Sequence, residues 1–175
     1  MCAIPEDRQR RGLILDFDIS ENMILEKYDK EPFSYKGRIN REEVKKYAKE
    51  IIGKFDIRPI DETSKAGSLS GGNQQKVVIS KWLAAKPDVL ILDEPTRGID
   101  VGAKAEIYKL MQDLAAEGVS IIMISSELPE IINNSSRIAV MNEGRLVKIL
   151  DPKTDESTQE IIMSYAVEEG VEEYV

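Results

Sequence analysis

Histidine is absent from this chain of 175 residues, and cysteine occurs once, as Cys2. A single thiol allows no intrachain disulfide and no metal site with several cysteine ligands, which suits a reducing cytosol. The longest aliphatic runs, such as Val89–Leu92 and Ile121–Ile124, have about four residues. A transmembrane helix requires about 20 apolar residues, so none is expected. The first residues lead directly into the charged stretch Glu6–Arg11, so we expect no signal peptide.

The chain has fewer positive than negative side chains: 24 Lys and Arg and 32 Asp and Glu, which give a formal net charge of -8. Such a chain repels phosphate backbones at long range, so we expect no nucleic-acid partner. The hydrophobic share of 42% and the charged share of 32% are ordinary for a soluble globular protein. They exclude collagen-like, mucin-like and wholly disordered chains. The length favours one domain, or one domain with an appendage.

The first half of the chain, residues 13–87, is predicted to be mostly helical. Ser20 is expected to cap a short helix, and Asn40 with Glu43 forms a capping box for a second one. A third helix is expected at 72–85, before a proline. The apolar residues of the second helix recur at helical spacing and are Val44, Tyr47, Ala48, Ile51, Ile52 and Phe55.

From residue 88 onward strands and helices alternate, which favours an α/β layer. The expected elements are a buried strand at 89–92, a helix capped by Asp100, a buried strand at 119–124, a short helix at 128–133, a hairpin at 137–150 and a helix that Ser157 and Glu160 begin. The predicted parts are a core strand with a loop at 1–12, a helical subdomain at 13–87, an α/β core at 88–150, and a helix with an acidic tail at 151–175. The tail, Glu168–Val175, is expected to be frayed.

Paired carboxylates, Asp93 and Glu94, follow the apolar run Val89–Leu92. Ligands of open α/β sheets bind at the carboxyl ends of the strands, where such a pair would lie. Asp93 could there hold Mg²⁺ through its water shell, and Glu94 could orient or deprotonate an attacking water. The alternative is that both residues only begin a loop before Pro95 and cap backbone groups.

A second signal is the run Ser70, Gly71 and Gly72 at the expected start of a helix. It offers a hydroxyl and unobstructed backbone N–H groups, and the helix dipole adds to their attraction for a phosphate. The alternative is an ordinary N-cap with a flexible approach.

Together, and in this order, the two signals resemble the ATP-binding-cassette (ABC) ATPases. Leu69–Asn73 is similar to the signature motif of that family, Leu90–Glu94 to its Walker B motif, and Gly98–Asp100 to its D-loop. The resemblance covers about residues 3–166. It is closest to the second, C-terminal cassette of double-cassette ATPases that power importers of ribose, galactose and xylose. The stretches that support this subgroup are Pro5–Arg8, Glu21–Asn22, Ser70–Lys76, Asp93–Gly98 and Val101–Lys104.

The resemblance implies an α/β fold, namely a partial P-loop NTPase fold with a helical signature subdomain and the distal half of the parallel-sheet core. It implies ATP and Mg²⁺ as cofactors, and a subunit on the cytoplasmic face of the membrane that couples ATP hydrolysis to monosaccharide uptake. The implied partners are a second cassette, transmembrane permease subunits and, indirectly, a sugar-binding protein. The implied site residues are Glu94 as catalytic base, Asp93 for magnesium, Glu6 in the Q-loop, Asp100 in the D-loop, and Ser70, Gly71, Gly72 and Asn73 toward the nucleotide of the partner cassette.

Three departures from the family pattern limit this implication. No Walker A loop of the form G-x-x-x-x-G-K-[S/T] is present, so the chain is expected to be truncated before the Q-loop and inactive by itself. Glu6 stands where most cassettes carry glutamine, and Ser126 stands where they carry the switch histidine.

A chain truncated in this way would leave sheet edges uncovered, which would favour self-association.

Two alternatives remain open. One is a regulatory or scaffold module without hydrolysis. The other is an ABC-type ATPase that acts on DNA, which is disfavoured because residues 13–68 show no heptads.

Overall fold

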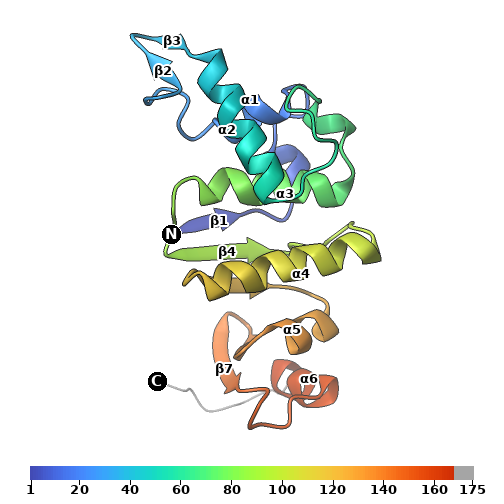
Figure 1. Cartoon of the computed structure of the whole chain (residues 1–175). Helices are drawn as coiled ribbons and strands as arrows, with labels where there is room; N and C mark the ends of the chain where they lie inside the picture. Colours follow the sequence, from blue (N-terminus) through green and yellow to red (C-terminus); the bar gives the residue numbers. More distant parts are fainter. Residues whose placement is uncertain (168–175) are drawn as a thin grey trace. The chain divides into compact units, whose positions relative to one another are not determined.

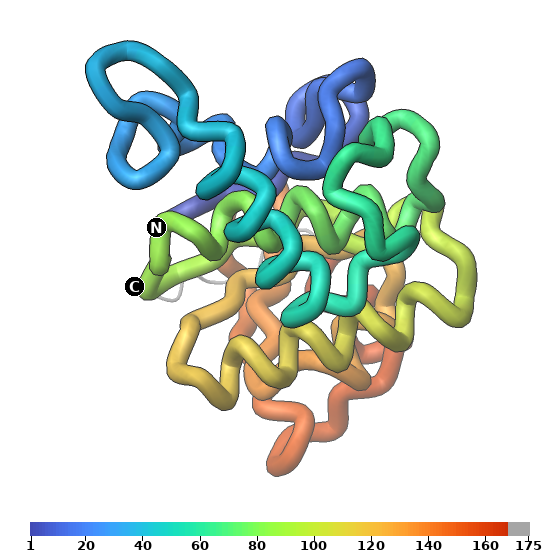
Figure 2. Tube along the Cα trace, turned by 45° about the horizontal axis from the view of Figure 1, so that its top comes forward, coloured from blue at the N-terminus to red at the C-terminus, as the bar shows by residue number. Residues whose placement is uncertain are grey.

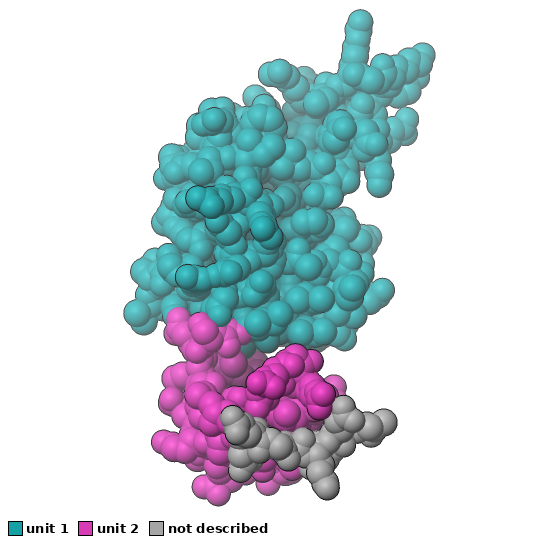
Figure 3. Space-filling view, turned by 180° about the vertical axis from the view of Figure 1, so that it is seen from behind, with its two compact units in different colours: residues 1–124 teal, residues 125–175 magenta. Residues whose placement is uncertain are grey.

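The computed structural model describes residues 1–167. The chain forms two compact units, residues 1–124 and 125–175 (Figure 3). The division into four parts drawn from the sequence stays a prediction. The tail expected to fray, Glu168–Val175, lies outside the described residues.

A parallel sheet forms the centre of the first unit, with the strand order β1 (Cys2–Ile4), β4 (Val89–Asp93) and β5 (Ser120–Ile124) (Figure 1). The middle strand β4 pairs on both sides, and its residues Leu90 and Leu92 have no exposed surface. The prediction of a strand in a parallel sheet is confirmed, but the prediction that both of its faces are buried was wrong, because Val89, Ile91 and Asp93 on the other face are only partly buried.

The strand β5 differs from its prediction. The sequence suggested a strand buried on both faces, but Ile122 and Ile124 are each 51% exposed. Among residues 1–167, β5 pairs only with β4, so it is an edge strand. The face that carries Ser120, Ile122 and Ile124 is exposed, and Ile121 and Met123 on the other face are only partly buried. The prediction of a strand was confirmed, and the prediction of its burial was wrong.

Three helices lie between β1 and β4 in the sequence: α1 (Ile19–Met23), α2 (Arg41–Lys54) and α3 (Gly71–Leu83). The first is capped by Asp18 and not by Ser20. The Asp18 carboxylate accepts from the backbone N–H of Glu21 at 2.7 Å, and the Glu21 carboxylate accepts from that of Asp18 at 3.0 Å. The Ser20 hydroxyl instead donates to Asp18, because the aspartate sits one residue before the helix and is a strong N-cap.

The helix α2 begins after Asn40, as predicted, and the Asn40 side chain accepts from the N–H of Glu43. The second bond of the predicted capping box is not formed, because the Asn40 N–H donates to the carbonyl of Phe33 at 2.8 Å. Its apolar stripe packs into the core through Val44, Ala48 and Ile52. A small hairpin of β2 (Ser34–Tyr35) and β3 (Arg38–Ile39), not expected from the sequence, precedes α2 and projects from it (Figures 1 and 2).

The helix α3 is the most deeply buried element of the first unit. Val77, Val78 and Ile79 have no exposed surface, and even its polar residues Gln74 and Lys81 are buried. Their polar ends bond to main-chain oxygens, since Gln74 donates to the carbonyl of Ala66 and Lys81 to that of Gly12. This bonding is what makes the burial of polar groups tolerable.

Short helical segments complete the first unit together with α4. The two short segments are a π-helix, η1 (Arg8–Gly12), and a 3₁₀ turn, η2 (Ala66–Ser68), and the longer helix is α4 (Val101–Ala116). Asp100 caps α4 as predicted, because its carboxylate accepts from the N–H of Ala103 at 3.0 Å.

The second unit consists of α5 (Leu128–Asn134), the antiparallel hairpin β6 (Ile138–Asn142) and β7 (Arg145–Leu150), and α6 (Gln159–Val167). The predicted hairpin is confirmed. The start of α6 is not capped by Ser157, because the hydroxyl of Thr158 accepts from the N–H of Ile161. Within residues 1–167, no helix combines the length and apolarity needed to span a membrane.

Candidate nucleotide site

The signature motif lies at the N-terminus of α3, where Ser70 is the N-cap. Its hydroxyl oxygen accepts from the backbone N–H of Asn73 at 3.4 Å and from the Asn73 side-chain nitrogen at 2.9 Å. Ser70 is exposed, and the first backbone N–H groups of a helix have no partner within the helix. This end of α3 therefore has the donors and the dipole that a phosphate would require.

The two signature glycines also have a packing role. A Cβ atom on Gly71 would lie 2.8 Å from a guanidinium nitrogen of Arg8 and 3.1 Å from the carbonyl oxygen of Gly98. A Cβ atom on Gly72 would lie 2.6 Å from the Cβ of Ala103. The glycines let α3 approach the D-loop and α4 closely, a second reason for their presence that the sequence analysis did not identify.

Arg8 was not among the predicted site residues, although it belongs to the stretch Pro5–Arg8 that supports the subgroup. Its guanidinium donates to the carbonyl of Arg97 at 2.7 Å and to that of Gly98 at 3.4 Å. Partial burial lowers the pKa of Arg8 from its ordinary value, and the charge of Asp7 opposes this effect. Arg8 thus fixes the path of the chain between Walker B and the D-loop.

The Walker B carboxylates lie where the sequence predicted them. Asp93 is the last residue of β4, and Glu94 bends the chain with a φ of 47°. A residue other than glycine in this left-handed region is uncommon and is often found at functional sites. The Glu94 N–H donates to the carbonyl of Ile124 at 2.9 Å, which fixes the bend to the end of β5.

The Q-loop position, Glu6, lies beside the same hollow as Asp93. Glu6 and Asp93 line a hollow of about 260 Å³, together with Pro5, Asp7, Arg10 and Arg11. Glu6 also forms an ion pair with Arg97. Among the described residues, no three His, Cys, Asp or Glu side chains are arranged so that they could hold a metal ion. A cation in this hollow would therefore need further ligands from outside the chain.

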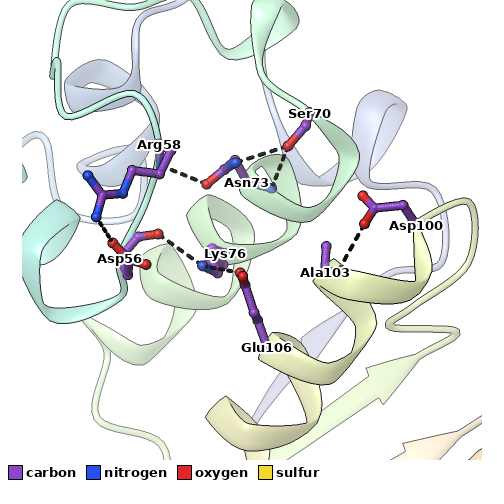
Figure 4. Close-up of polar contacts among 8 residues, drawn as sticks. All are labelled: Asp56, Arg58, Ser70, Asn73, Lys76, Asp100, Ala103 and Glu106. Atoms are coloured by element: carbon purple, nitrogen blue, oxygen red, sulfur yellow. Dashed lines mark hydrogen bonds and ion pairs between the residues drawn. The ribbon is translucent and has the colours of Figure 1, made fainter.

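The predicted site residues lie on several elements of the fold. Ser70, Gly71, Gly72 and Asn73 form the start of α3, while Asp100 belongs to the start of α4 (Figure 4). Ser126 is an exposed residue of the second unit.

A polar network anchors the signature helix. Asn73 accepts the backbone N–H of Arg58 at 2.7 Å through its side-chain oxygen. One turn later, the Lys76 ammonium donates to the carbonyl of Asp56 at 2.9 Å and pairs with Glu106 of α4 at 2.7 Å (Figure 4). The Lys76 side chain is only 7% exposed, and a buried cation requires such partners. The network ties α3 to the segment after α2 and to α4.

Comparison with known proteins identifies the family. The family model described as ABC transporter matches residues 6–97, more than half of the chain. The chain belongs to the ABC transporter family. Its curated relatives include the ribose import ATP-binding protein RbsA of Shouchella clausii, 51% identical over 166 residues, which are 95% of this chain and 32% of that protein. RbsA of Lactococcus lactis subsp. cremoris is 49% identical over 163 residues, 93% of this chain and 32% of the relative. The chain therefore spans about a third of the length of these relatives.

Solved structures confirm the predicted partial α/β cassette fold. A dimeric ATP-binding cassette in a post-hydrolysis state, bound to ADP and phosphate, aligns with a TM-score of 0.65 at 26% identity. The alignment covers 82% of this chain and 60% of that one. A Clostridium perfringens protein described as part of the ABC transporter complex cbiONQ aligns with a TM-score of 0.68 at 23% identity, over 94% of this chain and 60% of its own. This second likeness concerns the fold alone.

Proposed function

We propose that this chain is part of the ATP-binding subunit of a ribose importer and that the subunit couples ATP hydrolysis to sugar uptake. One observation carries the proposal. A serine–glycine–glycine helix start and a carboxylate pair at the end of a parallel strand occur in one compact unit, in the order that cassettes use. The names of the relatives support ribose as the sugar. The choice of ribose rests on those names and not on any residue of this chain.

The signature end of α3 is proposed to act on a nucleotide held by a second cassette. The Ser70 hydroxyl and the N–H groups of Gly71 and Gly72 would contact its γ-phosphate, where the dipole of the 13-residue helix α3 adds attraction. Hydrogen bonds to a charged group contribute more than neutral ones, about 1.5–3 kcal/mol each. In the same proposal, the helical subdomain contacts the permease subunits, and the ATP-binding subunit lies at the cytoplasmic face of the membrane.

The carboxylates are proposed to serve the second nucleotide, whose Walker A loop lies outside this sequence. Asp93 fits a magnesium ion, because proteins usually bind Mg²⁺ with one or two carboxylates plus water and substrate phosphates. When bound, the ion would neutralise phosphate charge. Glu94, held at the bend, would orient the attacking water and accept its proton. Glu6 lines the same hollow as Asp93 and would contact water there.

The two nucleotide sites are expected to be unequal. Ser126 occupies the position of the switch histidine, and its short hydroxyl cannot replace an imidazole that holds the γ-phosphate and water together. The site that uses Glu94 should then hydrolyse slowly. The site of the second cassette borrows only the signature from this chain, and it should carry most of the turnover.

Steady-state ATPase assays on a complete two-cassette protein that carries this sequence test the proposal. Ser70→Arg places a bulky side chain against the γ-phosphate and should abolish most activity. Glu94→Gln should cost much less than the 10²–10⁴-fold, in order of magnitude, typical of a general base that is in use. Ser136→Arg, at an exposed serine of the second unit, is the matched control.

Each deviation from this result has a distinct meaning. Equal losses for Ser70→Arg and Glu94→Gln would refute the unequal sites and make Glu94 catalytic despite the missing histidine. Full activity of Ser70→Arg would refute the signature assignment. Absence of ATPase activity from the complete unmodified protein would favour the alternative of a non-catalytic module, which the lack of a Walker A loop and of histidine supports.

A further inference from the structure

Asn73, the last residue of the signature, directs both polar ends of its side chain into the protein. The side-chain oxygen accepts from the backbone N–H of Arg58 at 2.7 Å, and the nitrogen lies 2.9 Å from the Ser70 hydroxyl oxygen (Figure 4). The resemblance implied that Asn73 faces the nucleotide. In the structure its side chain bonds to two protein groups.

The chemistry of these partners fixes the orientation of the amide. A backbone N–H can only donate, so the carbonyl oxygen of Asn73 must face Arg58. The amide nitrogen, which can only donate, then faces Ser70. Reversing the amide would set two donors against each other at Arg58.

This orientation determines where the hydroxyl proton of Ser70 can go. Among the described residues, the Ser70 oxygen has only donors as hydrogen-bond partners, namely the backbone N–H and the side-chain nitrogen of Asn73. These two N–H donors occupy both lone pairs of the Ser70 oxygen. The O–H of this exposed serine therefore points outward, where it can donate to an acceptor such as a phosphate oxygen.

The other partner of Asn73 is itself held in place. Asp56 and Arg58 lie in the segment that follows α2. Lys76 binds the carbonyl of Asp56, and the Asp56 carboxylate pairs with the Arg58 guanidinium at 2.7 Å. Asn73 and Lys76, one turn apart on α3, thus both bond to the segment that follows α2. Because the bond to Arg58 fixes the side-chain oxygen of Asn73, the side-chain nitrogen is held in place to orient Ser70.

We propose that Asn73 is a positioning residue that sets the Ser70 hydroxyl with its proton outward, and that it does not itself contact the nucleotide. The catalytic part of this inference rests on the proposed function, since it assumes that Ser70 meets a γ-phosphate. The structural part concerns this chain alone.

Asn73→Asp is the decisive variant, because it keeps the shape and the acceptor for Arg58 but replaces the donor by a second acceptor. The Ser70 hydroxyl would then donate inward to the carboxylate. A carboxylate in the first turn of a helix is favourable, so the thermal midpoint should stay the same or rise. In the complete ATP-binding protein, kcat should fall roughly 10- to 100-fold, the value of a hydrogen bond to a charged group, with KM for ATP changed less than about threefold.

A double-mutant cycle separates positioning from simple charge repulsion. If Asn73 acts through Ser70, Ser70→Ala should lower kcat by a similar factor, and Asn73→Asp should add nothing in the Ser70→Ala background. A further loss in that background would show that the new carboxylate repels the phosphate directly, which overturns the inference. Asn133→Asp, at an exposed asparagine, controls for added charge and should leave kcat unchanged.

A measurement on this chain decides the structural part independently of ATPase activity. In ¹⁵N NMR spectra, Ser70→Ala should shift the side-chain amide of Asn73 and speed its hydrogen exchange, and should leave that of Asn133 unchanged. An unaltered Asn73 amide refutes the inference whatever the catalytic results. If the complete unmodified protein shows no ATPase activity, the proposed function fails, while the NMR result still decides whether Asn73 holds Ser70.

Discussion

The contact between Gly72 and Ala103 yields a prediction with a definite sign. Gly72 lies in the first turn of α3, and its position has no left-handed φ. By helix propensity alone, Gly72→Ala would stabilise the chain by up to about 1 kcal/mol. The added Cβ would, however, lie 2.6 Å from the Cβ of Ala103, where carbon atoms ordinarily approach to about 3.5–4.0 Å.

Relieving this overlap requires α3 and α4 to separate by about 1 Å, the gap between 2.6 Å and an ordinary carbon contact. Overpacking of a well-packed site costs about 1–3 kcal/mol, which exceeds the gain in propensity. We expect Gly72→Ala to lower the free energy of unfolding by about 1–2 kcal/mol. For a chain of this length the thermal midpoint should fall by about 2–8 °C, as measured by circular dichroism.

Two further variants make the reasoning refutable. Gly53→Ala, in α2, adds a Cβ with nothing within 4 Å and should raise the midpoint. Ala103→Gly should destabilise the unmodified chain through lost propensity, yet restore stability to Gly72→Ala by removing the clashing carbon. A midpoint that rises for Gly72→Ala, or effects of the two substitutions that simply add, would show that the close approach is not what position 72 requires.

Two other predictions follow from the sequence and the sheet. Without a Walker A loop the phosphates lack most of their donors, so titration calorimetry of this chain should show MgATP affinity no better than about millimolar and no turnover; micromolar binding would contradict this. The half-exposed Ile122 and Ile124 of β5 should promote self-association, seen as dimers or larger species by light scattering at tens of micromolar. Ile122→Lys should reduce it, and a clean monomer of the unmodified chain would count against the idea.

Local signals in the sequence were sufficient where neighbouring residues determine the structure. Asp100 caps α4, Asn40 begins α2, and the apolar run before Asp93 forms the central strand, as predicted. Each depends on groups within a few residues of one another. The prediction of Ser20 as a cap was wrong because Asp18, two residues earlier, is an equally good cap, and only the folded path decides which residue precedes the helix.

Features that depend on distant segments could not be predicted. The contact of Arg8 with the carbonyl of Arg97 joins residues 89 positions apart. The exposure of Ile122 and Ile124 depends on which segments cover that face of the sheet, and the periodicity of the strand carries no information on this. The role of Asn73 depends on the N–H of Arg58, which lies 15 positions earlier. The motif implied a ligand contact for Asn73, which stays a prediction, and the contacts of its side chain with Arg58 and Ser70 come from the fold.

The depth of α3 has a consequence for experiments that introduce new side chains. Between Gly72 and Lys81 every residue except Asn73 is buried, so this helix has almost no face at which a dye, spin label or cross-linker could be attached without disturbing the packing. In a library of random substitutions α3 should be the least tolerant segment of the first unit. Probes that report on its motion belong on its neighbours, at exposed sites such as Lys45 of α2 and Gln112 of α4.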